Sequence, residues 1–268
     1  LPEALATASA FFRGRAQSYS PQQLMQVAKL FENLDLHGKS EGYYKEAIQK
    51  AQTQGAYDQR VVYANKLGYA HRMNGEYAKA VEVLVDNLEY QAKHEQHPQH
   101  PRTSLFMGYA LRDYGKTREA LQYFRQSRQL MEARQDSDLH VAVHEMGNTY
   151  VQLNAPDTAL AYQKQALEMR KKRPGDTFYL LVSYHDISGS YMVRGQYGKA
   201  VEYARKAVAL ADSTKNYWLL GGAHAQLGNL FYYVQDFDRA MQHAQTAKRL
   251  AHEHGFRNLK LTIYNLLR

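Results

Sequence analysis

Residues 146–159 read Met-Gly-Asn-Thr-Tyr-Val-Gln-Leu-Asn-Ala-Pro-Asp-Thr-Ala. In this stretch a small residue, Gly147, is followed three positions later by an aromatic residue, Tyr150, and seven positions later by Asn154. A second small residue, Ala159, comes twelve positions after the first. Two helices that cross closely need a small side chain on each where their axes approach. The stretch therefore predicts a helix, a tight turn and a second helix that packs on the first.

The same pattern recurs through the whole chain. The first small residue returns at intervals of 39 to 41 positions, at Ala28, Gly68, Gly108, Gly147, Ser188 and Gly228. The second follows twelve positions later in every copy, at Ser40, Ala80, Ala120, Ala159, Ala200 and Ala240. Apolar residues on the second helices recur at i, i+3, i+4 and i+7, which is the period of a helix. We therefore predict an all-α fold, a right-handed α-solenoid of six helix-turn-helix repeats.

The positions of the small residues predict where each repeat begins and ends. We expect an N-terminal helical lead-in over 1–20, six repeats over 21–260 (about 21–60, 61–100, 101–139, 140–180, 181–220 and 221–260), and the start of a seventh helix or a capping helix over 261–268. The sequence starts at Leu1 with no Met and no signal-peptide segment, so we expect a cleavage point or the edge of an excised segment. Because the last residues carry an apolar row, we expect the natural protein to continue beyond Arg268.

The turn inside each repeat carries residues that tolerate a left-handed backbone. Gly75, Gly115, Asn154 and Gly195 occupy the equivalent position, whereas the first repeat has Asp35 and the sixth has Gln235. Gly and Asn commonly end helices in this conformation. We expect typical turns in the four central repeats and less typical turns in the other two.

These motifs resemble the tetratricopeptide repeat family, through the small residue, the aromatic residue three positions later and the alanine twelve positions later. The period is near forty rather than the usual thirty-four, and this longer form looks like the repeats of kinesin light chains, of polarity adaptors with Leu-Gly-Asn repeats and of bacterial Rap-type peptide-sensing regulators. The runs 146–150 and 227–231 carry this likeness most directly. The Ala-Asp-Ser ending at 211–213 is also similar to the repeat arrays that precede bacterial sensor histidine kinases.

By that resemblance, the first helix of each repeat lines a concave surface, with inward positions three before, one after and four after the first small residue. The candidate partner-binding residues are Asn65, Tyr69, Arg72, Tyr109, Arg112, His144, Asn148, His185, Asn229 and Tyr232. Asparagine both donates and accepts hydrogen bonds, which suits the backbone of an extended peptide. Arg72 and Arg112 align in adjacent repeats beside tyrosines, which favours a site for a carboxylate. Alternatively, both arginines are solvated side chains lying over tyrosine rings.

The histidines predict no metal site. His144 and His185 align in adjacent repeats, where they could sense pH. A pair alone lacks the further ligands that a zinc site needs. His252 and His254 lack the i, i+4 spacing of two zinc ligands on one helix face. We expect no metal and no cofactor.

Composition and charge limit the class of function. The chain has no Cys, which excludes disulfides and thiolate sites, and it has no apolar run long enough to span a membrane. No phosphate loop, nucleophile elbow or kinase signature occurs, so we expect no enzyme activity in these residues. The net charge of +8 is compatible with binding nucleic acid, anionic lipid or an acidic protein. Its densest cluster, at 170–173, is better explained as cations at a helix C-terminus.

The sequence therefore predicts a non-catalytic scaffold that binds a protein or peptide. We expect the sensory or interaction segment of a larger bacterial signal-transduction protein, such as a sensor histidine kinase, which would place it outside the cytoplasm. A cytoplasmic peptide-responsive regulator or adaptor is the first alternative, and an RNA-binding helical array is the second, favoured only by the charge.

Overall fold

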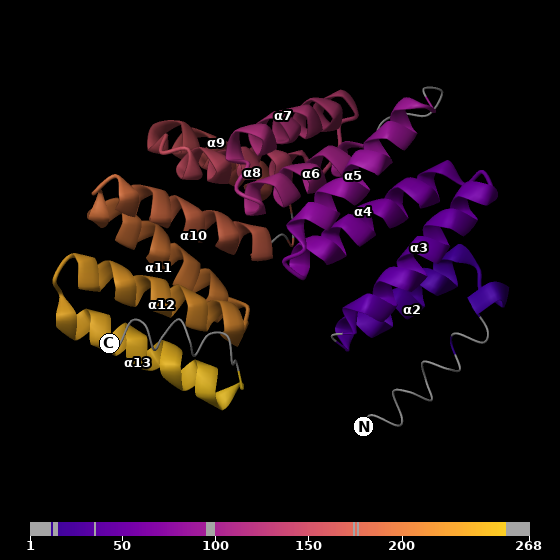
Figure 1. The fold of residues 1–268 in the computed structure, drawn as a ribbon. Helices are drawn as coiled ribbons and strands as arrows, with labels where there is room; N and C mark the ends of the chain where they lie inside the picture. The colour runs from indigo at the N-terminus through magenta and orange to yellow at the C-terminus, as the bar shows by residue number, and fades with distance from the viewer. Residues whose placement is uncertain are drawn as a thin grey trace. The chain divides into compact units, whose positions relative to one another are not determined.

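A computed structural model describes residues 12, 16–34, 36–94, 100–173, 175 and 177–255. The chain divides into two compact units, with the boundary between Asp136 and Ser137. Figure 1 shows the labelled helices of both units as a ribbon. A short 3-10 helix, η1 (Ala16–Ser18), opens the first unit. Its six α-helices form repeats 1 to 3: α2 (Pro21–Asn33) with α3 (His37–Thr53), α4 (Tyr57–Met73) with α5 (Tyr77–Ala92), and α6 (Pro101–Asp113) with α7 (Thr117–Ala133).

The second unit contains repeats 4 to 6: α8 (Leu139–Gln152) with α9 (Pro156–Lys171), α10 (Thr177–Val193) with α11 (Tyr197–Ser213), and α12 (Tyr217–Tyr233) with α13 (Phe237–Glu253). The described residues contain no β-strand. The prediction of an all-α fold of six helix-turn-helix repeats is confirmed. The lead-in expected over 1–20 is described only in part, and the helix expected over 261–268 lies outside the described residues.

The two rows of small residues are the points where paired helices approach most closely. A methyl group added to Gly68 would lie 2.7 Å from Leu84 Cγ, and one added to Gly108 would lie 2.5 Å from Phe124 Cε1. In repeat 5 the hydroxyl of Ser188 donates a 2.8 Å hydrogen bond to the carbonyl of Ala200, twelve positions later. All six residues of the second row are buried. The predicted crossing points are therefore confirmed.

The turns also follow the predicted positions. Gly75, Gly115, Asn154, Gly195 and Gln235 all have positive φ angles, between 55° and 86°. Asp35 lies outside the described residues. In all six repeats the carbonyl three positions after the first small residue accepts a hydrogen bond from the N–H five residues farther on, as from Glu76 to His71 (2.9 Å). This is the hydrogen bond that closes a helix C-terminus over six residues. Because Gln235 has the same positive φ and Asp236 N–H makes the same bond, the expectation of a less typical turn in the sixth repeat is wrong.

In four of the six repeats, paired rings bridge the two helices next to the crossing point. The residue three positions after the first small residue contacts the residue fifteen positions after it in four repeats. The ring centroids lie 5.4 to 5.6 Å apart in the pairs Phe31–Tyr43, Tyr150–Tyr162, Tyr191–Tyr203 and Phe231–His243. Such pairs contribute about 0.5–1.5 kcal/mol each beyond their burial. Repeats 2 and 3 have His71 with Val83 and Leu111 with Tyr123 at these positions.

We predict that Ala120→Leu and Ala200→Leu will each destabilise the protein by about 1–3 kcal/mol, because overpacking a close helix crossing forces the backbone to move. Both alanines are fully buried. Chemical denaturation measures the effect, and Ala161→Leu on the exposed face of α9 is the matched control. Unchanged midpoints for both crossing variants would contradict the assignment of these contacts.

Candidate functional site

Three predicted residues of the second unit converge on one carboxylate. Asp186, on α10, has one oxygen 2.9 Å from His144 Nε2 and 3.1 Å from Asn148 Nδ2. Its other oxygen lies 3.1 Å from His185 Nδ1. The contacts continue inward, because Gln163 donates to Asn148 (3.0 Å) and Ser190 donates to Gln163 (2.7 Å). First-helix residues of adjacent repeats are thus joined by a polar network that the sequence analysis did not include.

Burial and pairing act in opposite directions on this network. Burial would lower the pKa of the His144 imidazole, but its contacts with Asp186 and Glu145 outweigh burial and raise that pKa. Burial would likewise raise the pKa of Asp186, but the two histidines hold it well below its usual range. A protonated His144 beside an ionised Asp186 is therefore the favoured state in mildly acidic solution.

An apolar hollow of about 260 Å³ lies between α10 and α12, and His185 lines it. The other residues that line it are Phe178, Leu181, Val182, Ala207, Trp218, Leu219, Gly222 and Ala223. Phe178 is 53% exposed and Trp218, the single tryptophan of the chain, is 52% exposed. These two residues occupy the same position in repeats 5 and 6, ten before the small residue. The hollow thus presents two solvent-exposed aromatic side chains around an apolar floor.

These aromatic residues were not among those predicted from the sequence. The predicted positions lie within four residues of each small residue, whereas the residues that line the hollow lie on earlier turns of the first helices. A signal was present, because 178–182 (Phe-Tyr-Leu-Leu-Val) and 217–220 (Tyr-Trp-Leu-Leu) are apolar on every helix face. A helix on the protein surface needs only one apolar stripe, which packs against the core. Apolar residues on its other faces therefore indicate a further contact surface.

Four predicted residues of the first unit also lie together. The guanidinium of Arg72 lies 4.9 Å from the Tyr109 ring centroid and 5.9 Å from that of Tyr69. The guanidinium of Arg112 lies 5.5 Å from the same Tyr109 ring. Arg72 Nε is 2.6 Å from a carboxylate oxygen of Asp113, and Arg112 Nε is 3.9 Å from the other oxygen. The chain's own carboxylate therefore lies where the prediction would place a carboxylate of the partner.

The remaining predicted residues are placed differently. Asn65 is only 4% exposed, and its side-chain oxygen accepts a 2.9 Å hydrogen bond from Asn87, which also contacts Arg60. Asn229 is partly buried on α12, and Tyr232 is exposed at the end of that helix, with its ring 5.7 Å from Phe237. Contact of these three residues with a partner stays a prediction.

The basic cluster at 170–173 contains one buried member, Arg170, beside the exposed Lys171 and Lys172. Arg170 is 1% exposed, and it donates to His140 Nδ1 (3.1 Å), the carbonyl of Tyr179 (3.1 Å) and the hydroxyl of Ser183 (2.6 Å). Lys171 pairs with Glu168 at 2.7 Å. Arg170 and Lys171 lie in the last turn of α9, as expected for cations at a helix C-terminus. Arg170 is in addition buried, and it joins α9 to α8 and α10. Its burial could not be predicted from the sequence, because arginine is rarely buried.

Two further kinds of site are absent from the described residues. No group of three or more His, Cys, Asp or Glu side chains there could hold a metal ion. No helix in the described ranges is long and apolar enough to cross a membrane.

The profile of the tetratricopeptide repeat family matches residues 142–173, which span α8, α9 and the turn between them. Solved structures of such repeats are similar over most of the chain. The apo form of RapI matches with a TM-score of 0.68 and 15% identity, over 92% of this chain and 69% of that one. The fold is that of the tetratricopeptide repeat.

Two other repeat proteins show the same similarity. A signal-transduction ATPase with numerous domains and a tetratricopeptide repeat sensor, from Pyrococcus horikoshii, matches with a TM-score of 0.71 and 19% identity, over 90% of this chain and 37% of that one. BtubC from P. vanneervenii matches with a TM-score of 0.69 and 15% identity, over 81% of this chain and 91% of that one. A comparison with curated proteins finds no match. The prediction of a tetratricopeptide-type scaffold, with Rap-type likeness, is confirmed at the level of the fold.

We predict that Asp186→Asn will lower stability most in mildly acidic solution. The stabilisation from Asp186, whose pKa is lowered by folding, is present above its unfolded value of about 3.9 and is lost as the pH falls through the folded value. The stabilisation from His144, whose pKa is raised, is fully present below about 6.5 and is lost as the pH rises through the folded value. The stabilising contributions of Asp186 and His144 are therefore both present between about pH 4 and 6.5.

Urea denaturation at pH 5 and at pH 8.5 measures this difference. We expect a loss of about 3 kcal/mol at pH 5, as for a broken buried ion pair, and a clearly smaller loss at pH 8.5. Asp157→Asn is the control, because Asp157 pairs with Arg194 at an exposed position. Equal losses at both pH values would show that the His144–Asp186 pair does not form.

Proposed function

We propose that this chain is a non-catalytic scaffold that binds a protein or peptide, as the interaction segment of a larger bacterial signal-transduction protein such as a sensor histidine kinase. The observation that supports this most strongly is the apolar hollow between α10 and α12, with Phe178 and Trp218 exposed at its walls. Large apolar side chains left in water around a concavity are typical of binding sites.

The size and chemistry of the hollow define the contact that we propose. A volume of about 260 Å³ admits one large side chain but is smaller than an ordinary small-molecule pocket, which has at least about 300 Å³. Burying an aliphatic or aromatic side chain there would contribute about 1.5–3 kcal/mol. We propose that an apolar anchor residue of the partner enters the hollow, and that His185 at its edge contacts the peptide backbone or a neighbouring polar side chain.

The other predicted residues extend the proposed contact set in each unit. In the first unit Tyr69, Arg72, Tyr109 and Arg112 offer aromatic faces and guanidinium donors around Asp113. An acidic side chain of the partner would compete with Asp113 for Arg72. Asn148, Asn229 and Tyr232 are the polar and aromatic residues that we propose along the first helices of the second unit. Asn65 in the first unit and His144 in the second, which are 4% and 3% exposed, are the least accessible predicted residues.

A peptide-responsive regulator is the second candidate. It is favoured by the similarity to RapI over 92% of this chain. It is also favoured by the similarity to the signal-transduction ATPase from Pyrococcus horikoshii, which has a tetratricopeptide repeat sensor. In this role the occupied and free states would differ in conformation, and the ligand would favour one of them. The gene sequence beyond the codon for Arg268 separates the two candidates, since a membrane span with a kinase domain supports the first. An RNA-binding array is disfavoured, because the densest basic cluster is engaged within the chain.

We predict that peptides selected from a random library on the full chain will carry an apolar anchor, and that Trp218→Ala will weaken their binding at least about tenfold, the equivalent of 1.4 kcal/mol. Fluorescence anisotropy of the labelled peptides measures the affinity. Tyr233→Ala is the control, because Tyr233 is an equally exposed aromatic residue of α12 outside the hollow. Loss of binding in the control but not in the Trp218 variant would refute this site.

A second prediction concerns acidic partners. Replacing both Arg72 and Arg112 with Glu should abolish binding of peptides that carry Asp or Glu, since two guanidinium donors become repelling carboxylates beside Asp113. Circular dichroism should show an unchanged helix content. The matched charge control replaces Lys171 and Lys172 with Glu on the exposed end of α9, and it should leave binding unchanged. If the lysine variant loses binding and the arginine variant keeps it, the carboxylate site is not in the first unit.

A further inference from the structure

Hydrogen bonding in the apolar hollow between α10 and α12 centres on His185. Of the nine described residues that line the hollow, His185 alone has a side chain that can accept a hydrogen bond. The indole of Trp218 only donates, and the other seven residues carry no polar side-chain atom. A ligand that fills the hollow therefore meets mainly apolar surface and one imidazole acceptor.

The neighbouring carboxylate determines which ring nitrogen of His185 accepts. Asp186 lies 3.1 Å from Nδ1 of His185 and 2.9 Å from Nε2 of His144. Burial would raise the pKa of Asp186, but the two histidines hold it well below its usual range. The carboxylate is therefore ionised and can only accept hydrogen bonds. A neutral imidazole at this position thus carries its hydrogen on Nδ1, and Nε2 is the nitrogen that accepts from a ligand.

Contacts with both neighbouring first helices hold this arrangement. The second oxygen of Asp186 accepts a 3.1 Å hydrogen bond from Asn148 on α8. Gln226 on α12 donates a 2.8 Å hydrogen bond to the backbone carbonyl of His185. The side chain of His185 is nevertheless 57% exposed. The imidazole is therefore fixed at Nδ1 and along its backbone, while the ring remains accessible to a ligand.

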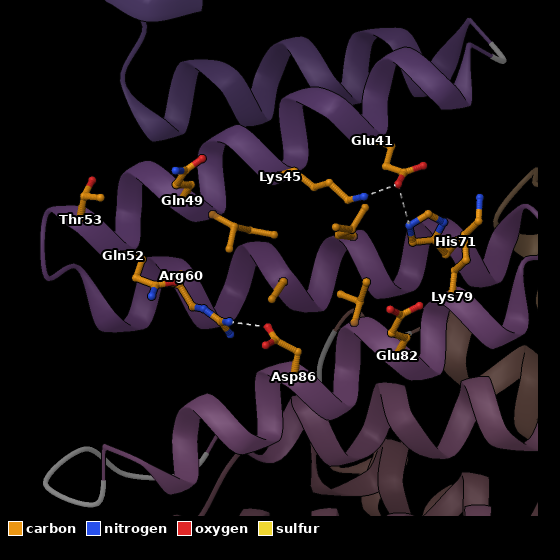
Figure 2. A pocket seen from close by; sticks show the side chains of 14 residues that line it. Glu41, Lys45, Gln49, Gln52, Thr53, Arg60, His71, Lys79, Glu82 and Asp86 are labelled. Carbon is orange, nitrogen blue, oxygen red and sulfur yellow. Dashed lines mark hydrogen bonds and ion pairs between the residues drawn. The ribbon is translucent and has the colours of Figure 1, made fainter.

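The larger groove of the first unit has a different chemistry. It has a volume of about 720 Å³, and it is lined by the histidine and valine of repeat 2 that stand where repeat 5 has paired tyrosine rings (Figure 2). Three lysine or arginine side chains and three carboxylates also line it. Figure 2 shows that Glu41 pairs with Lys45 and that Arg60 pairs with Asp86. That groove favours no single sign of charge, whereas the hollow of the second unit favours one kind of side chain.

We propose that the partner residue that enters the hollow is a tyrosine, with its ring against Phe178 and Trp218 and its hydroxyl donating to Nε2 of His185. This rests on the proposed function, and it names the anchor residue. Tyrosine combines an apolar ring with a hydroxyl that both donates and accepts, so it also suits the indole N–H of Trp218. A phenylalanine ring would fill the same apolar space but would leave Nε2 without a donor. His185 is thus the specificity-determining residue, and Asp186 is a positioning residue.

Fluorescence titrations of the full chain test the proposal. Trp218 is the single tryptophan and lines the hollow, so its emission reports binding there. The probes are N-acetyl-tyrosinamide and N-acetyl-phenylalaninamide, used at about pH 8, where histidine side chains in model peptides are neutral. We expect a saturable change with both probes, and at least about threefold tighter binding of the tyrosine probe, as for one added hydrogen bond.

Variants then assign the preference to its residues. His185→Phe should bring the ratio of the two affinities to about one, because it removes the acceptor and keeps an aromatic wall. His185→Gln, whose amide oxygen can accept, should restore part of the ratio. Asp186→Asn should also lower the ratio, since an amide no longer fixes the hydrogen on Nδ1. His252→Phe is the control, because His252 is an exposed histidine outside the hollow, and it should leave the ratio unchanged.

The outcomes separate this proposal from the proposed function. Equal affinity of the intact chain for the two probes would overturn the tyrosine assignment and assign His185 to the peptide backbone, but it would keep the hollow as a binding site. An unchanged ratio in His185→Phe would also overturn the assignment. If neither probe gives a saturable change, the hollow is not a side-chain site, and the proposed function loses its main support together with this proposal.

Discussion

The contact between the small residue of each first helix and the second helix of the same repeat controls the rest of the structure. At Gly68, Gly108 and Gly147 there is no room for even a methyl group, because side chains of the second helix lie against the backbone. Such a contact fixes the relative position of the two helices along their axes, since sliding either one would cause overlap. The constant interval of twelve residues follows from it, and length differences fall in the connections between repeats.

Once the position of the two helices along their axes is fixed, neighbouring positions can hold different types of side chain without a change of fold. The positions three and fifteen residues after the small residue hold paired rings in four repeats, but histidine and valine in repeat 2. The position ten residues before it holds aromatic residues only in repeats 5 and 6. One repeat therefore contains a groove where another is filled, and two repeats present aromatic side chains that the others lack. Function in such an array depends on these substitutions rather than on the shared fold.

The fold could be predicted from the sequence because its determinants are local. Small residues, turn residues and the aromatic residue recur at fixed spacings within about forty positions, and the structure places them as those spacings require. The polar interior could not be predicted in this way. Arg170 and Asn65 are polar residues that are buried because partners come from other helices, namely Ser183 and Asn87. Spacing within one helix gives no information about such partners.

The candidate site was predictable only in part for the same reason. Alignment of adjacent repeats correctly indicated that Arg72 and Arg112 lie near one another, and that His144 and His185 share a neighbourhood. It did not reveal Asp113 and Asp186, the carboxylates that pair with these groups. The hollow at Phe178 and Trp218 requires side chains from three helices, so it becomes visible only in three dimensions.

The position of the single tryptophan has a consequence for studying cooperativity. Trp218 lies on α12, so its fluorescence reports on the second unit alone, whereas circular dichroism counts helices in both units. In a repeat array, unfolding propagates from one repeat to the next through their interfaces. The two signals coincide only when both three-repeat units unfold in one transition. The chain therefore carries an intrinsic chromophore that distinguishes concerted from stepwise loss of its repeats without any label.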